Sequence, residues 1–498
     1  MTLLQTPGQA AGWLRSHVSG SLWTDSRKVC SGDGFIAWPG AATDGRRYVT
    51  QVLEAGATAC LVEADGLEDF GFIDPRVVAY RGLKTAAAPI SAAYFDEPSK
   101  QLQVIAITGT NGKTSTAWWL AQALGKLGRK CGIVGTLGIG EPEAMVFNGL
   151  TTPDPVLLQQ QLRRFVDEGF AACALEASSI GIAEQRLDAT HIRVAIFTNF
   201  TQDHLDYHGS MQVYWEAKKK LFTWPGLEAA VLNVDDEKGA ELEALLAGSG
   251  LDVWTISLGG LARIRTENIE QGAHGVAFDV VEAAQRLRIS SSMVGLYNVS
   301  NMLGAIAAMR AMGISLALAV SACEGLPPVP GRLETLLVEG LPMVAIDYAH
   351  TPDALEKVLV ALRPVAHGRS GRLWCVFGCG GDRDATKRPL MAAVAQKHAD
   401  QIVVTSDNPR NESATVIISQ ILVGLTHCDS VHVEADRALA IMQTLASARP
   451  GDVVLLAGKG HESYQEIHGI KHPFSDRSHA EAALSAMLAA RLSGGGVS

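Results

Sequence analysis

The 498-residue sequence predicts an α/β protein of three domains, each built around a mostly parallel β-sheet. The chain is longer than one hydrophobic core usually supports, and about three domains are expected at this length. Short apolar runs alternate with helix-like segments, which is the pattern of parallel sheets covered by helices. Two segments rich in turn-forming residues, 96–99 and 325–332, interrupt that alternation and predict the domain boundaries.

Residues 1–98 are predicted to form a small N-terminal α/β domain. The short apolar runs at 35–37 and 59–62 are expected to be strands, and residues 48–55 are expected to form a helix. The segment Asp96-Glu97-Pro98-Ser99 has the composition of a linker. We therefore place the first boundary at residue 98.

Residues 99–328 are predicted to form a central domain with a phosphate-binding loop. An apolar, β-branched run at 105–107 leads into Gly109-Thr110-Asn111-Gly112-Lys113-Thr114-Ser115, and a helical pattern follows at 117–124. Backbone N–H groups of such a loop cradle a phosphate, Lys113 supplies a positive charge, and the Thr114 hydroxyl reaches a magnesium ion. Only Thr110 and Asn111 separate the two glycines, whereas the full Walker pattern has four residues there, so an ordinary turn is the alternative.

Polar residues also follow two other predicted strands of the central domain. Glu176 comes directly after the strand at 172–175, and His204 lies in the segment after the strand at 194–197. Because ligands bind at the carboxyl ends of parallel strands, Glu176 and His204 are candidate magnesium ligands beside Thr114. A pair of hydrogen-bonded loops is the alternative interpretation.

Lys218 lies on the apolar face of a predicted helix at 213–222. Helical spacing places it with Tyr214, Leu221 and Phe222. A lysine in apolar surroundings tends to lose its charge, and a neutral amine can react with carbon dioxide to give a carbamate, an anionic metal ligand. The alternative is a lysine that extends from the edge of the core into water.

Residues 329–498 are predicted to form a Rossmann-like third domain. Apolar runs at 343–347, 374–378, 401–405 and 452–456 are expected to be its buried strands. The segment Ser406-Asp407-Asn408-Pro409-Arg410 follows the third of these runs, at the end where a ligand is expected.

Composition excludes several classes of protein. The net charge is −10 and no block of like charges is longer than residues 218–220, which argues against a nucleic-acid-binding sheath or a polybasic membrane patch. No apolar run approaches the length of a membrane span, and the first residues lack the pattern of a signal peptide. The eight cysteines include no Cys-x-x-Cys pair, so we expect reduced thiols in a cytoplasmic protein.

A set of motifs in a fixed order resembles the Mur ligase family. The resemblance extends from about residue 25 to residue 477, and the short phosphate loop is the family's own version. The motifs are Gly109-Thr110-Asn111-Gly112-Lys113-Thr114, Glu176-Ala177-Ser178-Ser179, Asn199 with Asp203-His204, Ala217-Lys218, Tyr297-Asn298-Val299-Ser300-Asn301, Pro330-Gly331-Arg332-Leu333-Glu334 and Asp347-Tyr348-Ala349-His350.

The resemblance implies roles for individual residues. Catalysis is implied for Lys113, Lys218, His204 and Glu176, and magnesium binding for Thr114, Glu176, His204 and a carbamylated Lys218. ATP contacts are implied for Gly109, Thr110, Asn111, Gly112, Lys113, Thr114, Ser115, Asn298, Asn301, Arg332, Asp347 and His350. Contacts to a UDP-muramoyl dipeptide are implied for Thr24, Ser26, Thr151, Thr152, Ser178 and Arg186. One departure is Ile180, where many relatives have a histidine.

Within the family, the sequence is similar to members that add meso-diaminopimelate. The residues implied to bind this amino acid are Arg383, Asp407, Asn408, Pro409, Arg410, Gly458 and Glu462. Diaminopimelate carries a distal carboxylate that lysine lacks, and Arg410 is suited to bind it through two parallel hydrogen bonds. Glu462 and Asp407 are suited to an ammonium group.

The implied reaction is ATP-dependent amide formation. Diaminopimelate would be joined through an acyl phosphate to the D-glutamate γ-carboxylate of UDP-N-acetylmuramoyl-L-alanyl-D-glutamate, in peptidoglycan synthesis that supports cell shape and division. ATP would be a substrate and Mg²⁺ a cofactor. The expected protein is a cytoplasmic monomer with no nucleic-acid or membrane partner. A lysine-adding Mur ligase, a folylpolyglutamate-type ligase and, from a different class, a P-loop phosphotransferase or ATPase are the alternatives.

Overall fold

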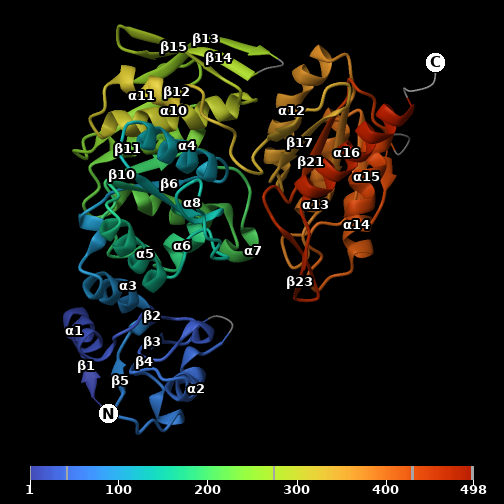
Figure 1. The fold of residues 1–498 in the computed structure, drawn as a ribbon. Coiled ribbons are helices and arrows are strands. Elements are labelled where there is room, and N and C mark those ends of the chain that lie inside the picture. Colours follow the sequence, from blue (N-terminus) through green and yellow to red (C-terminus); the bar gives the residue numbers. More distant parts are fainter. Residues whose placement is uncertain (1, 41–42, 273–274, 428–430, 495–498) are drawn as a thin grey trace.

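The computed structural model describes residues 2–40, 43–272, 275–427 and 431–494. Three sheet-based units follow one another along the chain (Figure 1). The N-terminal unit, in blue, lies at one end of the central unit, and the C-terminal unit, in orange and red, lies along one side of it. Within the described residues no helix is long and apolar enough to cross a membrane.

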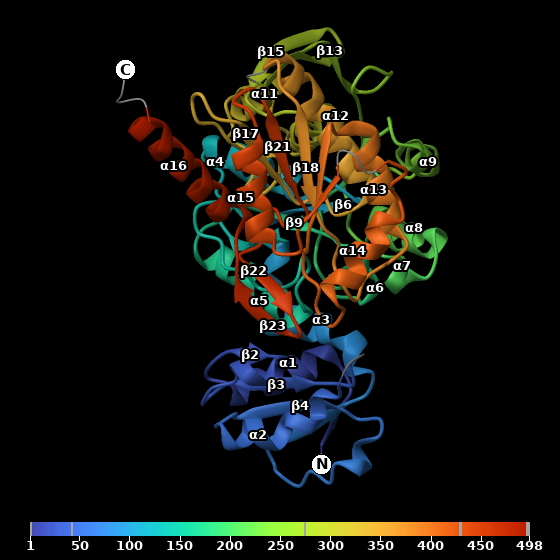
Figure 2. The same cartoon turned by 90° about the vertical axis from the view of Figure 1, so that its right-hand side faces the viewer.

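The N-terminal unit is a five-stranded parallel sheet with helices on both faces. One hydrophobic cluster packs α1 and α3 against the sheet, and a second packs α2 against the opposite face. Helix α3 also contacts α5 of the central unit, which connects the two units (Figure 2). The elements are β1 (Leu3–Leu4), α1 (Pro7–His17), β2 (Leu22–Trp23), β3 (Gly34–Ala37), α2 (Val49–Glu54), β4 (Ala59–Glu63), β5 (Val77–Tyr80) and α3 (Leu83–Tyr94).

The central sheet has the strand order β15-β14-β13-β12-β11-β10-β6-β9-β7-β8. The strands from β13 to β7 run parallel, whereas β8 is an antiparallel edge and β13 to β15 form an antiparallel meander. The strands are β6 (Gln103–Thr108), β7 (Cys131–Gly135), β8 (Gly138–Gly140), β9 (Ala172–Glu176), β10 (Val194–Phe197), β11 (Ala229–Asn233), β12 (Asp252–Ser257), β13 (Ile264–Gly272), β14 (Gly275–Glu282) and β15 (Gln285–Ser291).

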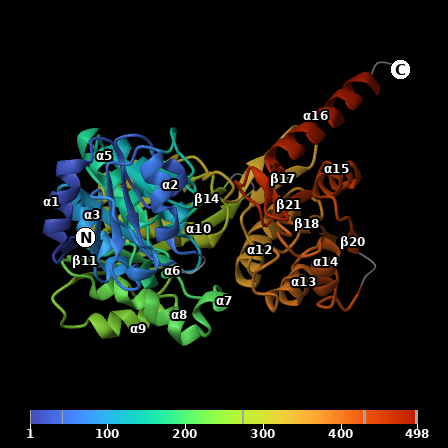
Figure 3. The same cartoon turned by 90° about the horizontal axis from the view of Figure 1, so that it is seen from below.

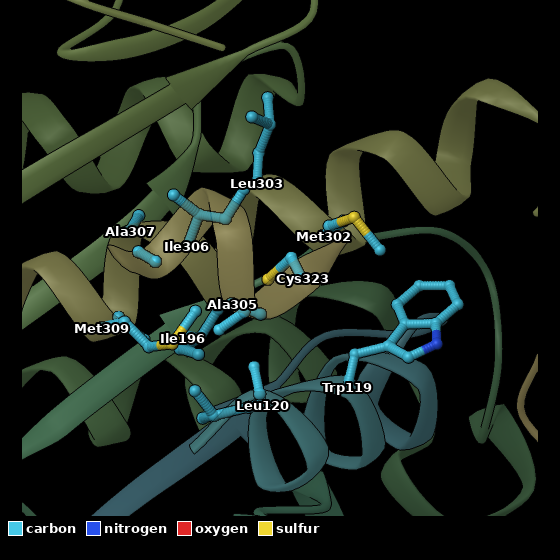
Figure 4. Packing of buried hydrophobic residues seen from close by; sticks show 14 of the residues in the cluster. Trp119, Leu120, Ile196, Met302, Leu303, Ala305, Ile306, Ala307, Met309 and Cys323 are labelled. Atoms are coloured by element: carbon cyan, nitrogen blue, oxygen red, sulfur yellow. The ribbon is translucent and has the colours of Figure 1, made fainter. Parts of the chain in front are cut away.

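Helices cover both faces of the parallel part of this sheet. Ile105 and Ile107 of β6 face one hydrophobic cluster, and Val104 and Ala106 face the other, which is why the strand is apolar throughout. Figure 4 shows Trp119 and Leu120 of α4 near Ile196 and the residues of α10. The helices are α4 (Lys113–Lys126), α5 (Pro155–Asp167), α6 (Ser179–Ala183), α7 (Leu205–His208), α8 (Met211–Lys219), α9 (Glu237–Leu246), α10 (Leu296–Ala311) and α11 (Leu316–Cys323).

The C-terminal unit is a six-stranded sheet in which only the edge strand β16 is antiparallel. Helices α12, α13 and α14 cover one face, and α15 and α16 cover the other (Figure 3). The elements are β16 (Glu334–Leu336), β17 (Met343–Asp347), α12 (Pro352–Gly368), β18 (Leu373–Phe377), α13 (Lys387–His398), β19 (Gln401–Val404), α14 (Ala414–Leu422), β20 (Val431–Val433), α15 (Arg437–Ser447), β21 (Val453–Ala457), the hairpin β22 (Tyr464–Ile467) and β23 (Ile470–Pro473), and α16 (Asp476–Gly494).

The predicted α/β class and its mostly parallel sheets are confirmed. The predicted helix at 213–222 is α8, continued as a short 3-10 helix at Lys220–Thr223, and it buries Tyr214 and Lys218 as expected. The meander β13 to β15 is an addition that the sequence analysis missed. Its strands β13 and β15 mix buried with exposed positions and therefore lack the continuous apolar runs of the parallel strands, whereas β14 between them is largely buried.

Candidate active site

The turn from β6 into α4 requires both of its glycines. Gly109 has φ +142°, and a Cβ atom there would lie 1.9 Å from Thr198 Oγ1. Gly112 has φ +87°, and a Cβ atom there would lie 2.3 Å from Asn301 Oδ1. Both glycines therefore allow a close approach that a side chain would block. Asn111 fixes the loop from its middle, because its backbone N–H donates to Asn199 Oδ1 at 2.9 Å.

Two lysines donate to the same atom of this loop. The Nζ atoms of Lys113 and Lys218 lie 2.8 Å and 2.7 Å from the carbonyl oxygen of Gly109. Lys218 is buried, and its Nζ lies 4.5 Å from the centroid of the Tyr214 ring. Burial, together with the charge of Lys113, holds the pKa of Lys218 well below its usual range. The two ammonium groups repel each other, which adds to the shift of Lys218 toward its neutral form.

Glu176, at the end of β9, is buried and accepts three hydrogen bonds. Its Oε2 accepts from the hydroxyls of Thr114 and Thr136 at 3.1 Å each, and its Oε1 accepts from the Thr136 N–H at 2.9 Å. The Cβ position of Gly135 lies 2.2 Å from Glu176 Oε1, so that glycine makes room for the carboxylate. The sequence analysis missed Thr136. This residue directly follows β7, and the rule that singled out polar residues after two other strands would have found it.

His204 enters the same site from the segment before α7. Its side chain is 40% exposed, and its Nε2 lies 3.6 Å from Asp203 Oδ2. Desolvation lowers the pKa of His204 to about 4, with Asp203 opposing and Lys113 and Lys218 reinforcing the shift. The imidazole is therefore neutral at physiological pH, which is the form that binds a metal.

Across the described residues, no group of three or more His, Cys, Asp or Glu side chains is arranged to hold a metal ion. A metal site at this position would therefore need oxygen ligands in addition to those of Glu176. The Thr114 hydroxyl lies beside that carboxylate and also accepts a hydrogen bond from Arg332 Nη2 at 3.1 Å. A carbamate on Lys218 would add two further oxygen atoms. This oxygen-rich set, with one neutral imidazole, fits magnesium chemistry.

A cleft of about 200 Å³ brings the predicted ATP and metal residues together. Gly109 is the exception and does not line the cleft. The predicted residues that line it are Thr110, Asn111, Gly112, Lys113, Thr114, Ser115, Thr151, Glu176, Ser178, His204, Lys218, Asn298, Asn301, Arg332, Asp347 and His350. The cleft therefore lies between the central and C-terminal units.

The C-terminal unit closes this cleft with residues at the end of β17. Asp347 accepts hydrogen bonds from the N–H groups of Leu333 and Ala349, at 2.7 Å each. Burial raises the pKa of Asp347 to about 6 against the opposing effect of Arg332. At the start of α12, Asp353 Oδ2 accepts from Asn111 Nδ2 at 3.0 Å, which connects the third unit directly to the phosphate loop.

A second cavity, of about 210 Å³, adjoins the first and shares Asp203, His204, Tyr348 and His350 with it. Pro409 does not line it, whereas the other predicted amino-acid contacts do. These are Arg383, Asp407, Asn408, Arg410, Gly458 and Glu462. The structure thus places the predicted amino-acid pocket beside the predicted ATP site.

The backbone of Arg410 has a left-handed conformation, with φ +50°. Its N–H donates to the carbonyl oxygen of Glu466 at 3.0 Å, and its Nη1 donates to that of Gly381 at 2.8 Å. The Nε atom lies 3.4 Å from Glu466 Oε2. These contacts leave guanidinium N–H groups at the cavity wall. Arg383, by contrast, is exposed and donates to the carbonyl oxygen of Asp382.

The sequence analysis also missed Lys459, which follows Gly458 at the end of β21. This lysine is fully buried, and its Nζ lies 3.1 Å from Asn408 Oδ1 and 3.0 Å from Glu462 Oε2. A lysine between two glycines carries no periodic signal for burial. Only its place directly after a buried strand, beside the predicted contacts, pointed to it.

Four of the predicted UDP-substrate residues form one cluster. Thr152 donates to the carbonyl oxygen of Glu176 at 2.7 Å and lies 2.9 Å from Ser178 Oγ, and Arg186 Nη1 donates to the Thr152 carbonyl oxygen at 2.9 Å. Thr151 bonds to Thr136, at 3.0 Å between the hydroxyls. Two other predicted residues lie elsewhere. Thr24 hydrogen-bonds Asp154 at the start of α5, and Ser26 begins a short 3-10 helix in the N-terminal unit.

Three family models match the chain in order. They are the Mur ligase family, catalytic domain, at residues 21–96, the Mur ligase middle domain at 107–309, and the Mur ligase, glutamate ligase domain, at 331–460. Together they cover most of the three sheet-based units.

Curated relatives match over nearly the full chain. A protein of Acidovorax sp. (strain JS42), named UDP-N-acetylmuramoyl-L-alanyl-D-glutamate--2,6-diaminopimelate ligase, is 58% identical over 97% of this chain and 98% of its own length. A protein of Janthinobacterium sp. (strain Marseille) with the same name is 46% identical, again over 97% and 98% of the two chains.

Solved structures show the same three-domain fold. A structure titled as a UDP-N-acetylmuramoyl-L-alanyl-D-glutamate--2,6-diaminopimelate ligase is 32% identical, covers 94% of this chain and 95% of its own, and has a TM-score of 0.64. MurF ligase from Thermotoga maritima, in complex with ADP, has a TM-score of 0.67 at 16% identity over 95% and 98% of the chains. The identity and coverage of the relatives and the three matching models show that the chain belongs to the Mur ligase family.

Proposed function

We propose that this ligase adds meso-diaminopimelate to the D-glutamate γ-carboxylate of UDP-N-acetylmuramoyl-L-alanyl-D-glutamate, with ATP as the energy source. The observation that carries the proposal is the pocket formed by Asn408, Arg410 and Glu462, which opens beside the phosphate loop. The names of relatives at up to 58% identity support the same substrate pair.

An amide bond forms in water only after the carboxylate is activated. The γ-phosphoryl group of ATP passes to the substrate carboxylate and gives an acyl phosphate, which the amine of the amino acid then attacks, releasing inorganic phosphate. Lys113 and the loop N–H groups neutralise charge on the transferred phosphoryl group. The substrate reaches this point past Thr151, Ser178 and Arg186, which are joined to Glu176 through Thr136 and Thr152.

Magnesium, when bound, supplies positive charge that offsets the charge developing on the phosphoryl oxygens. Thr114, Glu176, His204 and a carbamylated Lys218 would hold it. The chemistry of these donors supports the assignment, because His204 is neutral and the Lys218 amine is driven toward its neutral, nucleophilic form. Lys218 Nζ would form a new N–C bond to carbon dioxide and release one proton.

The amino-acid pocket favours an acceptor with charges of both signs at its far end. Arg410 and the Asn408 amide face a carboxylate, and Glu462 faces an ammonium group. With lysine bound, the Arg410 guanidinium would lack its partner in a closed site, which disfavours lysine.

Further parts of the proposal concern the whole enzyme. We place its domains at residues 1–98, 99–328 and 329–498, for the UDP-substrate, for ATP and for the amino acid. The enzyme is proposed to act as a cytoplasmic monomer in peptidoglycan precursor synthesis, which supports cell shape and division. The acidic net charge of −10 agrees with small-molecule substrates rather than nucleic acid.

The test is phosphate release from ATP with the UDP-muramoyl dipeptide and a panel of amino acids. Release that requires both the dipeptide and meso-diaminopimelate supports the proposal. Release that needs no amino acid would indicate a phosphotransferase or ATPase. Release with L-lysine but not with diaminopimelate would assign the lysine-adding reaction instead.

A further inference from the structure

Lys459 supports the amino-acid pocket without lining it. Its side chain has no solvent exposure, and Nζ reaches Asn408 Oδ1, Glu462 Oε2 and, at 3.6 Å, Asp407 Oδ1. All three partners line the cavity, whereas Lys459 is not among its lining residues. A fully buried ammonium group is costly unless it is paired. Lys459 therefore depends on these three partners, and each of them lines the pocket.

The contacts of Lys459 fix which way the Asn408 amide points. Asn408 Oδ1 accepts from Lys459 Nζ at 3.1 Å and from the backbone N–H of Glu466 at 2.9 Å. Both of these groups are donors only, so the amide oxygen must face them. The Asn408 NH₂ group then donates to Glu462 Oε2 at 2.8 Å, and its second hydrogen remains for a ligand in the cavity.

The same contacts orient Glu462. Within the described part of the chain, the hydrogen bonds to this carboxylate, from Asn408 Nδ2 and Lys459 Nζ, both go to Oε2. Oε1 therefore remains as an acceptor for a ligand. Asn408 thus presents a donor and Glu462 an acceptor on the same cavity wall, and one buried cation contacts both side chains.

We propose that Lys459 is a positioning residue that sets the specificity of the amino-acid site. The donor of Asn408, with Arg410, receives the distal carboxylate of the acceptor, and Oε1 of Glu462 receives its distal ammonium. Without Lys459, the Asn408 oxygen keeps only the backbone N–H of Glu466 as a donor, and the Asp407 and Glu462 carboxylates lose their shared counter-charge. The inference rests on the proposed function and adds to it the residue that gives the pocket its polarity.

The test compares Lys459→Met with Lys471→Met in the full-length enzyme. Lys471 is an exposed lysine on the neighbouring β23, with its Nζ 4.1 Å from the Tyr464 ring centroid, so its loss removes the same charge nearby without touching Asn408. We expect Lys459→Met to raise the KM for meso-diaminopimelate about tenfold to a hundredfold and to lower the ratio of diaminopimelate to lysine efficiency. Acyl phosphate formation without an amine should stay within about twofold of wild type, as should every property of Lys471→Met.

A second variant, Asn408→Asp, keeps the size of the side chain but replaces the NH₂ donor with an oxygen. It should raise the KM for diaminopimelate to a similar extent, and it decides the matter if Lys459→Met does not fold. Normal KM in Asn408→Asp, or a Lys459→Met enzyme that loses acyl phosphate formation as severely as ligation, overturns the positioning role. If the wild-type enzyme ligates diaminopimelate and Lys459→Met has the same KM and the same preference, this inference alone is overturned. Wild-type enzyme that never uses diaminopimelate overturns the proposed function as well.

Discussion

Lys113 and Lys218 share one hydrogen-bond acceptor, the carbonyl oxygen of Gly109. Two positive charges at one oxygen repel each other, and the more deeply buried lysine gives up its proton more readily. We predict that Lys218→Ala abolishes ligation with the fold intact, and that added bicarbonate or short carboxylic acids partly restore activity. Lys219→Ala is the matched control, since Lys219 pairs with Glu216 outside the cleft. Near-normal activity of Lys218→Ala would rule out the carbamate ligand.

Asp347 makes the stability of the protein depend on pH. Its pKa in the fold is about 6, against about 4 in an unfolded chain. Between these values the folded protein holds a proton that the unfolded chain lacks, so stability from this group falls as the pH rises to 6 and is constant above it. We predict that Asp347→Asn gains stability relative to wild type as the pH rises through this window, by about 3 kcal/mol at its upper end. Urea unfolding at a series of pH values measures the difference, and a difference independent of pH would contradict the buried, raised carboxyl.

Arg410 is predicted to carry much of the preference for diaminopimelate. A bidentate arginine–carboxylate pair in a closed site contributes about 2–4 kcal/mol, so Arg410→Ala should lower kcat/KM for diaminopimelate roughly a hundredfold. Lysine should lose far less, because it lacks the distal carboxylate. The ratio of the two efficiencies cancels general damage to the site. An equal loss for both amino acids would mean that Arg410 only supports its own loop, through Gly381 and Glu466.

At the scale of elements, the turn from β6 to α4 is the proposed site of phosphate binding. We predict that Lys113→Ala and Thr114→Ala each remove ATP-dependent acyl phosphate formation, because one loses the charge at the phosphoryl group and the other the hydroxyl beside Glu176. Trapping of the acyl phosphate in the absence of an amine measures this step. Lys126→Ala, at the far end of α4, is the control. Undiminished trapping in both loop variants would mean that this turn does not bind the phosphates.

The buried strands and the phosphate loop could be predicted from the sequence, because strands covered on both faces are continuously apolar and the loop needs glycines at fixed places. The meander β13 to β15 could not, since its half-exposed strands resemble ordinary amphipathic segments. Thr136 and Lys459 were missed for a different reason. Their roles depend on partners 40 and 51 residues away in sequence, Glu176 and Asn408, and only the folded chain brings such pairs together.

At the scale of the whole molecule, the active site exists only where the units meet. Arg332 donates a hydrogen bond to Thr114, and Asp353 accepts one from Asn111. The C-terminal unit therefore contacts the phosphate loop of the central unit directly. The amino-acid cavity shares His204 of the central unit with the ATP cleft. Under the proposed function, activation of the acid and attack by the amine would take place in these adjoining cavities, and relative movement of the units is expected to accompany the reaction.

The most direct test is a competition for one acceptor site. The enzyme is given ATP, magnesium, the UDP-muramoyl dipeptide and equal concentrations of meso-diaminopimelate and L-lysine, and the mass of the product is measured. We predict that almost all product carries diaminopimelate, in an excess of several orders of magnitude, because lysine leaves the Arg410 guanidinium without its partner. Product that carries mainly lysine, or consumption of ATP with no ligated product, would contradict the proposed reaction.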